Sequence, residues 1–301
     1  MSARRCACLL TKSRMENSDF QIMLTRYALE RLLFRLGASQ YRERFTLKGV
    51  LLFATWLPDP HCATRDLDLL GTGSSEHAAI AEIFREICTL TVTDDGVAFD
   101  VKGLKVASIR EDAEHGGVRI RTTAFIDVAR IAIQIDTGFG DAITPAPVDI
   151  VYPVLLDNPA PKLRAYPVET VIAEKFHAMV HRGIAISRLK DFYDLWFIIQ
   201  TFELRRSTVV EAMRRTFERR GTAPPVAQPV GLSDDYVTAW SVRWRTFLSR
   251  EHMAAAPADL AVVVSDLRIF FIPLLTAASP DDQKWLPKGP WAAAATLKQS
   301  T

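Results

Sequence analysis

The pattern of apolar and polar positions divides the chain into two parts. In the first part, apolar residues recur either at the spacing of a helix or at the two-residue alternation of a strand. Ile131, Ile133 and Ile135 share one face of a predicted strand, which leaves Asp136 on the opposite face. The elements predicted here are a helix over 19–36, a strand or helix start over 46–53, a strand around Asp66, a helix from 74 or 75 to 88, hairpin strands over 104–109 and 118–122, and a strand over 131–136.

The second part begins after a proline-rich connector. Six prolines lie from residue 145 to residue 167, and beyond them almost every segment has helical spacing. The predicted helices cover 167–182, 187–204, 207–219, 235–250 and 258–276, with a loop over 221–231 and loosely held residues at the C-terminal end. We therefore predict an α/β (α+β) protein, with a disordered extension over 1–18, a mixed-sheet domain over 19–155 and a helical C-terminal domain over 156–301.

Composition sets broad limits on function. The chain has 301 residues, of which 49% are hydrophobic and 24% are charged, enough for one large domain or two small ones. A formal net charge of +2 gives no general attraction for nucleic acid. The cysteines, Cys6, Cys8, Cys62 and Cys88, lack the spacing of a metal site, so we expect reduced thiols in a cytoplasmic protein. No segment has the length of a membrane span, and we expect no membrane association.

Two carboxylates at alternate positions carry the main chemical signal of the first part. Asp66 and Asp68 point to one face of their predicted strand, about 6.6 Å apart, while Leu67 between them points into the core. Such a pair repels itself unless a cation lies between, and magnesium prefers hard oxygen ligands and bridges to phosphates. If the strand that ends in Asp136 pairs beside it, three carboxylates meet, as in two-metal phosphoryl or nucleotidyl transfer sites. A solvated, acidic edge strand is the alternative.

A lysine interrupts the apolar stripe of the first helix after the connector. Lys175 falls between Val171 and Met179, where an ammonium must reach water or meet a partner, because burying it alone is very costly. Either its stem packs while its head reaches water, or it contacts nucleotide phosphates. In the second case, methionine at this position should weaken nucleotide binding and leave the fold at least as stable.

Two further carboxylates share a face of the next helix. Asp191 and Asp194 lie three residues apart, and Lys190 is close enough to pair with Asp194. They are either acidic residues favoured near a helix N-terminus, or carboxylates that orient Lys175 or act as a general base.

Five segments between roughly residues 20 and 205 keep a common order and spacing: 47–49 (LKG), 64–68 (TRDLD), 134–141 (QIDTGFGD), 166–175 (YPVETVIAEK) and 190–195 (KDFYDL). Together they resemble the AbiEii/AbiGii nucleotidyltransferase toxin family. The resemblance implies a DNA-polymerase-β-like nucleotidyltransferase domain joined to a helical C-terminal domain. Members are toxins of toxin–antitoxin or phage-abortive systems, and some transfer nucleotides to the 3′ end of tRNA.

By this resemblance, Asp66 and Asp68 are magnesium ligands, Lys175 binds the nucleotide, and Asp191 or Asp194 completes the site. The resemblance implies an NTP and a tRNA or other RNA as substrates. It also implies a cognate antitoxin, of the winged-helix type, encoded nearby.

One departure from the family concerns the triphosphate. Members often carry Gly-Gly-Thr or Gly-Ser after the strand, whereas Lys48-Gly49 is followed here by Val50-Leu51, without the second glycine or the hydroxyl. Gly49 still permits close backbone approach. Lys48 or Arg65 would then supply the missing contact to the nucleotide.

Three functions are compatible with these residues. They are a metal-dependent nucleotidyltransferase toxin, a related fold without turnover that binds RNA or a partner protein, and a small-molecule nucleotidyltransferase of the antibiotic-modifying kind. The intact acidic and lysine positions favour the first function. Nucleotidyltransferases of the antibiotic-modifying kind lack the motifs found here at Lys175 and Asp191. Because the predicted site residues lie on both sides of the connector, we expect that residues 1–155 alone are inactive.

Overall fold

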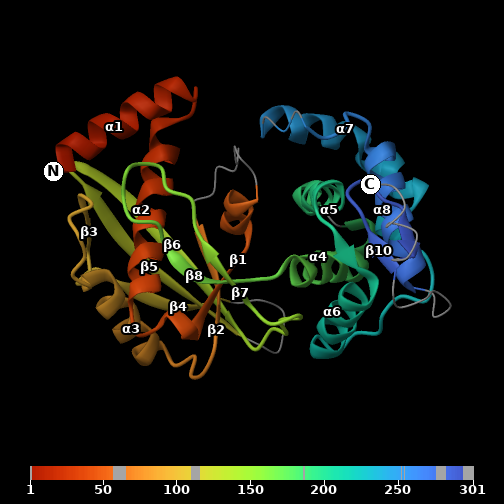
Figure 1. The fold of residues 1–301 in the computed structure, drawn as a ribbon, viewed down its shortest axis with the longest axis horizontal. Helices are drawn as coiled ribbons and strands as arrows, with labels where there is room; N and C mark the ends of the chain where they lie inside the picture. Colours follow the sequence, from red (N-terminus) through yellow and green to blue (C-terminus); the bar gives the residue numbers. More distant parts are fainter. Residues whose placement is uncertain are drawn as a thin grey trace. The chain divides into compact units, whose positions relative to one another are not determined.

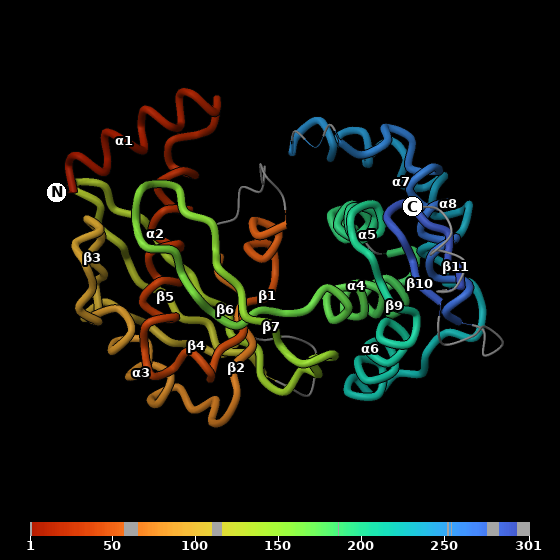
Figure 2. Tube along the Cα trace, in the orientation of Figure 1, coloured from red at the N-terminus to blue at the C-terminus, as the bar shows by residue number. Residues whose placement is uncertain are grey.

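The chain folds into two compact units. The first unit is Met1–Asp141 with Pro147–Tyr166, and the second is Ala142–Ala146 with Pro167–Thr301. Figures 1 and 2 follow the chain through the elements of each unit. The structure is a computed structural model, and it describes residues 2–56, 66–109, 116–185, 187–251, 253, 255–275 and 283–293.

The first unit is built on a mixed sheet, as the sequence predicts. Among the described residues this sheet has eight strands in the order β3-β5-β6-β2-β1-β8-β7, with β4 also paired to β5. β2 is parallel to β6 and β1 is parallel to β8, whereas the other pairs are antiparallel. The strands are β1 (Phe45–Lys48), β2 (Asp66–Gly71), β3 (Val97–Phe99), β4 (Lys105–Ile109), β5 (Gly117–Ile126), β6 (Ala129–Phe139), β7 (Val148–Val151) and β8 (Lys162–Ala165). The helical elements are α1 (Ser2–Met15), α2 (Phe20–Ala38), α3 (His77–Thr89) and the 3-10 turns η1 (Arg42–Arg44) and η2 (Val50–Thr55).

The alternation in β2 and β6 separates the two faces of the sheet. Leu67 and Leu69 of β2 are buried, and so are the three isoleucines of β6. The helix α2 packs against β5, β6 and β8, and full burial of each such side chain stabilises the fold by about 1.5–3 kcal/mol. The polar residues of β2 and β6 therefore share the opposite face.

The helix α2 continues two residues beyond its predicted end at residue 36. The helix begins at the N-cap Asp19, whose carboxylate accepts the N–H of Ile22 at 3.0 Å. It continues through Gly37 to Ala38. A Cβ at position 37 would lie 2.4 Å from the carbonyl oxygen of Lys162. Glycine is therefore needed for the close approach of β8, and it does not terminate the helix.

The boundary between the units lies after Tyr166 and not at 155/156 as predicted. β8 pairs in parallel with β1, and the N–H of Tyr166 donates to the carbonyl oxygen of Leu47 at 3.0 Å. Pro161 and Pro167 flank β8 and do not interrupt it. The second half of the proline-rich segment is therefore part of the sheet.

The predicted disordered extension is wrong, because most of residues 1–18 form α1. This helix packs against α2 and buries Leu9 completely. Its Arg5 forms an ion pair with Asp157. Only Leu9 and Ser13 of α1 are buried among its described residues, so the helix has no periodic apolar stripe that the sequence could reveal.

The second unit is helical, as predicted, with a small added sheet. α4 packs against α5 and α6, and α8 packs against α5 and α7. In the region expected to be loosely held, the Nε1 of Trp285 donates to the carbonyl oxygen of Ile199 at 2.7 Å. None of the described helices combines the length and apolarity needed to cross a membrane. The elements are α4 (Val168–Arg182), η3 (Gly183–Ala185), α5 (Leu189–Thr201), β9 (Leu204–Arg205), α6 (Arg206–Arg219), η4 (Val230–Leu232), α7 (Asp234–Arg250), α8 (Leu260–Phe271), η5 (Ile272–Leu275), β10 (Gln283–Trp285) and β11 (Trp291–Ala293).

Candidate active site

Four charged residues form one row across the polar face of the first unit's sheet. The register of β1, β2, β6 and β5 places Lys48 opposite Asp68, Asp68 opposite Asp136, and Asp136 opposite Arg119. Asp66 lies two residues from Asp68 on the same face of β2. The pairing of the Asp66 and Asp136 strands, which the sequence left as an assumption, is therefore present. This row, Lys48–Asp68–Asp136–Arg119, has a cation at each end and two carboxylates in the middle.

Gly49 lies directly against the carboxylate of Asp68. Its backbone has φ +71° and ψ −157°, a region that is essentially restricted to glycine. A Cβ at this position would lie 2.1 Å from Oδ2 of Asp68 and 2.8 Å from its Cγ. The missing side chain therefore makes room for Asp68. The sequence pointed to Gly49 as a backbone contact for a nucleotide, whereas the structure shows a contact with a carboxylate.

Asp136 is held by an arginine that the sequence reading missed. Nε and Nη2 of Arg119 donate to the two carboxylate oxygens of Asp136 at 2.7 and 2.6 Å. These hydrogen bonds, followed by the negative charges of Asp136, Asp66 and Asp68, raise the pKa of Arg119 against the opposing effect of burial. Within the described parts of the chain, no three acidic, histidine or cysteine side chains are grouped as a metal site. One of the three carboxylates predicted to bind metal, Asp136, thus pairs with Arg119.

Lys48 at the other end of the row is also bound to a carboxylate. Its Nζ lies 2.8 Å from Oδ2 of Asp141, and it lies 5.5 Å from the centre of the Tyr166 ring, within the range of a cation–π contact. Gly138 lies beside this ammonium, and a Cβ there would make an ordinary contact with Nζ at 3.7 Å. Arg65, the other predicted contact to the nucleotide, lies outside the described residues.

The donor set of Asp66 and Asp68 suits a hard divalent cation. Both offer carboxylate oxygens from one strand face, and the glycine at position 49 leaves room for the second carboxylate. Asp136, the third predicted ligand, is bound by Arg119 through both of its carboxylate oxygens.

The second unit brings Lys175, Asp191 and Asp194 together. The ammonium of Lys175 lies 2.7 Å from Oδ1 of Asp191 and 2.8 Å from Oδ2 of Asp194. Arg188 pairs with Asp191 at 2.9 Å, and Lys190 pairs with Asp194 at 2.8 Å. The lysine on the apolar stripe of α4 thus meets partners on α5, which excludes a lysine whose head is held by water alone.

Charge balance stabilises the ionised forms of this cluster. Burial by itself lowers the pKa of Lys175, but the carboxylates of Asp194 and Asp191 outweigh it and the net pKa is raised. Burial likewise raises the pKa of Asp194, but Lys175 and Lys190 outweigh it and the net pKa is lowered. The Lys175 side chain remains 18% exposed, against 3% for Asp191 and 2% for Asp194. The two carboxylates therefore hold the ammonium of a side chain that is only partly exposed.

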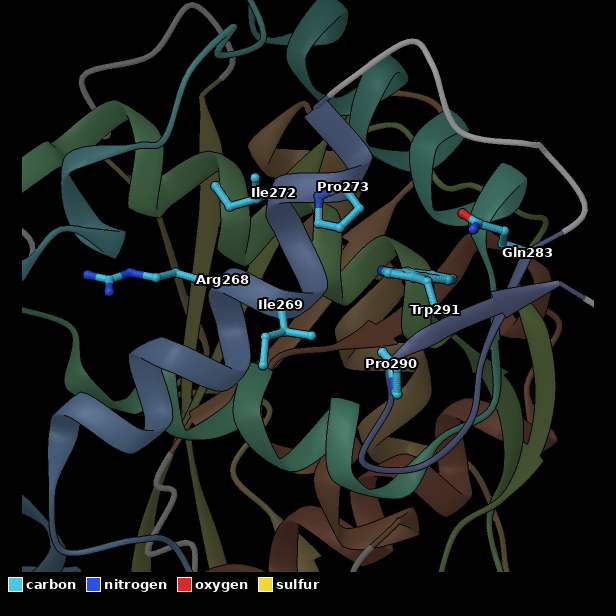
Figure 3. A pocket seen from close by; sticks show the side chains of 7 residues that line it. All are labelled: Arg268, Ile269, Ile272, Pro273, Gln283, Pro290 and Trp291. Atoms are coloured by element: carbon cyan, nitrogen blue, oxygen red, sulfur yellow. The ribbon is translucent and has the colours of Figure 1, made fainter.

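A separate pocket of about 470 Å³ lies in the second unit, at the end of α8 (Figure 3). The described residues that line it are mainly apolar, and none of them is a carboxylate. The described lining therefore offers none of the hard oxygen ligands that metal-assisted phosphate chemistry uses. The pocket is lined by Arg268, Ile269, Ile272, Pro273, Gln283, Pro290 and Trp291.

The chain is similar to a known protein family and to two solved structures. A family model described as nucleotidyl transferase AbiEii toxin, type IV TA system, matches residues 31–264. JHP933 from Helicobacter pylori is 10% identical, with a TM-score of 0.43 over 81% of this chain and 90% of that chain. Another structure from H. pylori, described as a nucleotidyltransferase, is 11% identical, with a TM-score of 0.46 over 81% and 93%. No curated protein matches the sequence.

Proposed function

The chain belongs to the AbiEii nucleotidyl transferase toxin family, and we propose that it transfers a nucleoside monophosphate from an NTP to an RNA hydroxyl, with the 3′ end of tRNA as the acceptor. The observation that carries this proposal is the pair Asp66 and Asp68 on the polar face of the sheet, with Gly49 making room for the second carboxylate. Both aspartates and the glycine lie inside the segment that matches the family.

We assign the binding of magnesium to Asp66 and Asp68. When bound, the cation supplies charge neutralisation to the phosphates and to the reacting oxygens. The protein's own part is to keep the two carboxylates on one rigid strand face, next to the cationic Lys48. Positioning and charge are the main contributions that a protein makes to phosphoryl transfer chemistry.

In the second unit, we assign nucleotide binding to Lys175 and the positioning of its ammonium to Asp191 and Asp194. Two nearly buried carboxylates fix the ammonium while part of the side chain stays exposed. A lysine held in this way can contact a phosphate without losing further conformational freedom. General-base catalysis by either aspartate is disfavoured, because cations already occupy both: Lys175 and Arg188 pair with Asp191, and Lys175 and Lys190 pair with Asp194.

The family's type IV toxin–antitoxin assignment implies an antitoxin partner. We propose a winged-helix antitoxin encoded beside the toxin gene, and the cytoplasm as the site of action. The described cysteines Cys6, Cys8 and Cys88 are free thiols, which agrees with a reducing compartment.

The test is to incubate the purified full-length chain with magnesium, total tRNA and each radiolabelled NTP in turn. We expect label at the tRNA 3′ end, and we expect Asp68→Asn to abolish it. The matched control is Asp149→Asn, which removes a carboxylate of β7 that is 75% exposed and paired with Arg42. Loss of transfer in both variants, or in neither, would contradict the assignment to Asp68.

One observation favours a second function, an RNA-binding protein without turnover. After Gly49, the turn η2 buries Leu51, Leu52 and Phe53 where family members often offer a hydroxyl. The hydroxyl of Thr55 donates to the carbonyl oxygen of Leu52. Retention of tRNA without transfer from any NTP would support this second function.

A further inference from the structure

A bidentate contact with Asp136 fixes the Arg119 side chain on the sheet. It lies opposite Asp136 in the antiparallel β5–β6 pair, and its Nε and Nη2 bind the two oxygens of that carboxylate at 2.7 and 2.6 Å. Hydrogen bonds between ionised partners are about twice as strong as neutral ones, and the planar fork fixes the orientation of the guanidinium. The side chain of Asp136 is 18% exposed, so the contact is partly shielded from water.

This contact occupies one edge of the guanidinium. Nη1 carries two N–H donors, and no described residue binds it. The Arg119 side chain is 31% exposed. A guanidinium that is held along one edge and open along the other is preorganised to bind a phosphate oxygen.

The location of Arg119 matches this chemistry. It ends the row Lys48–Asp68–Asp136–Arg119, on the same sheet face as the proposed magnesium ligands. Two strand spacings separate it from Asp68, which corresponds to about 9.6 Å along the hydrogen-bonding direction. The charges of Asp66 and Asp68 contribute to the raised pKa of Arg119, so the three groups lie within electrostatic reach of one another.

We propose that Arg119 binds the polyphosphate of the NTP and that Asp136 is a positioning residue for Arg119, not a metal ligand. This inference rests on the proposed function and adds a nucleotide contact to it. Arg119 would also take the place of the hydroxyl that the segment after Gly49 lacks. The triphosphate would then be bound from β5, across the sheet, and not from the segment after β1.

The alternative role of Asp136 as a metal ligand has a clear electrostatic cost. Asp136 would have to share its carboxylate between Arg119 and the cation, and the guanidinium beside it would repel the incoming cation. In the proposed arrangement, Arg119 keeps its partner, and the negative phosphates add a second favourable contact at its open edge.

The experiment measures two affinities of the full-length chain by calorimetry: that for Mn²⁺ alone, and that for inorganic tripolyphosphate in the presence of Mn²⁺. We expect Arg119→Gln to weaken tripolyphosphate binding at least about tenfold, and Arg119→Lys to restore part of it, because lysine keeps the charge but loses the fork. Mn²⁺ affinity should stay within about twofold of wild type in both variants. The matched control is Arg121→Gln, two residues along the same strand face, which is expected to bind as wild type because Arg121 contacts Gln134 and not a carboxylate.

Asp136→Asn separates the positioning role from a ligand role. We expect weaker tripolyphosphate binding with unchanged Mn²⁺ affinity, and no further loss when it is combined with Arg119→Gln, because both changes remove the same contact. A tenfold or greater loss of Mn²⁺ affinity in Asp136→Asn would overturn the proposal, as would wild-type tripolyphosphate binding by Arg119→Gln. If the wild-type chain binds neither probe, the proposed function itself fails; if it binds both and Arg119→Gln has no effect, only this inference fails.

Discussion

Replacing Gly49 with alanine tests the acidic pair through its nearest neighbour. Gly49 has φ +71° and ψ −157°, and a non-glycine residue in such a region costs about 1–3 kcal/mol. The new Cβ would also lie 2.1 Å from Oδ2 of Asp68 and 2.7 Å from the Cβ of Asp68, whereas ordinary contacts begin at 3.4 Å. Rotation of the carboxylate relieves the first clash and not the second, so β2 or the residues around Gly49 must shift as well.

Two measurable effects follow from Gly49→Ala. Backbone strain and displacement together should lower the free energy of unfolding by about 2–4 kcal/mol, which corresponds to a fall in melting temperature of roughly 5–15 °C. A misplacement of about 1 Å costs about 100-fold in a site that depends on geometry. We therefore expect Mn²⁺ affinity and nucleotide transfer to fall by about two orders of magnitude.

Gly73→Ala is the matched control. Gly73 also has a positive φ, +80°, but a Cβ added there would lie 4.0 Å from its nearest neighbour, Cζ of Arg44, which leaves space for a methyl group. This variant should lose stability through backbone strain and keep both Mn²⁺ affinity and transfer. Calorimetry, thermal unfolding and the tRNA assay give the three readouts. Wild-type Mn²⁺ affinity in a folded Gly49→Ala protein would refute the reasoning, and so would equal losses of activity in the two variants.

Three further predictions concern charged residues. Asp66→Ala should abolish nucleotide transfer and change the free energy of unfolding by less than about 1 kcal/mol in a denaturant titration, because the side chain is half-buried on the polar face. Lys175→Met should destabilise the second unit by about 2–4 kcal/mol, since it leaves nearly buried carboxylates with fewer cations. Because its pKa is lowered in the fold, ionised Asp194 stabilises the protein at neutral pH, and this stabilisation is lost as pH falls. The difference in unfolding free energy between wild type and Lys175→Met should therefore become smaller in acid. Burial, only partly offset by Arg31, raises the pKa of Glu30 to about 7. The free energy of unfolding should therefore fall by up to about 3 kcal/mol as pH rises from about 4.5 to 7. Glu30→Gln should flatten this slope in stability measurements across that range.

The Lys175→Met prediction reverses the expectation from sequence. An apolar stripe with one lysine indicates that methionine fits by shape, and Val171 and Met179 are indeed buried. The stripe does not reveal that two carboxylates from α5 bind the ammonium. The fit of a methionine side chain at position 175 was therefore predictable from the sequence of α4 alone. The electrostatic cost of removing the ammonium depends on how α4 packs against α5.

The faces of β2 and β6 were predictable because side chains alternate strictly in a strand. A one-residue error would have moved the leucines and isoleucines out of the core, so the positions of Asp66, Asp68 and Asp136 followed from the apolar residues between them. Pairing between β2 and β6 could only be assumed from the sequence, because a local pattern gives the facing of a strand and not its neighbour.

Arg119 was missed because the lengths of β5 and β6 were underestimated. The predicted strands left residues 123–130 unassigned, whereas the structure continues both strands to a tight turn at Asp127 and Val128, with φ +55° at Asp127. In a two-residue hairpin the turn fixes the register of the whole ladder. Had the turn been recognised, simple counting along the two strands would have placed Arg119 opposite Asp136.

The candidate site residues that the sequence pointed to share a physical feature: each is unfavourable in its local setting. Asp68 lies beside another carboxylate, Lys175 lies on an apolar stripe, and Gly49 adopts a conformation that other residues avoid. A local conflict of this kind is visible in one segment, because alternation or helical spacing defines what should be there. Its resolution comes from another segment, such as α5 for Lys175. Sequence patterns therefore identify one member of each interaction, and the missing member has to be found from strand register or helix packing, as the Arg119–Asp136 pair illustrates.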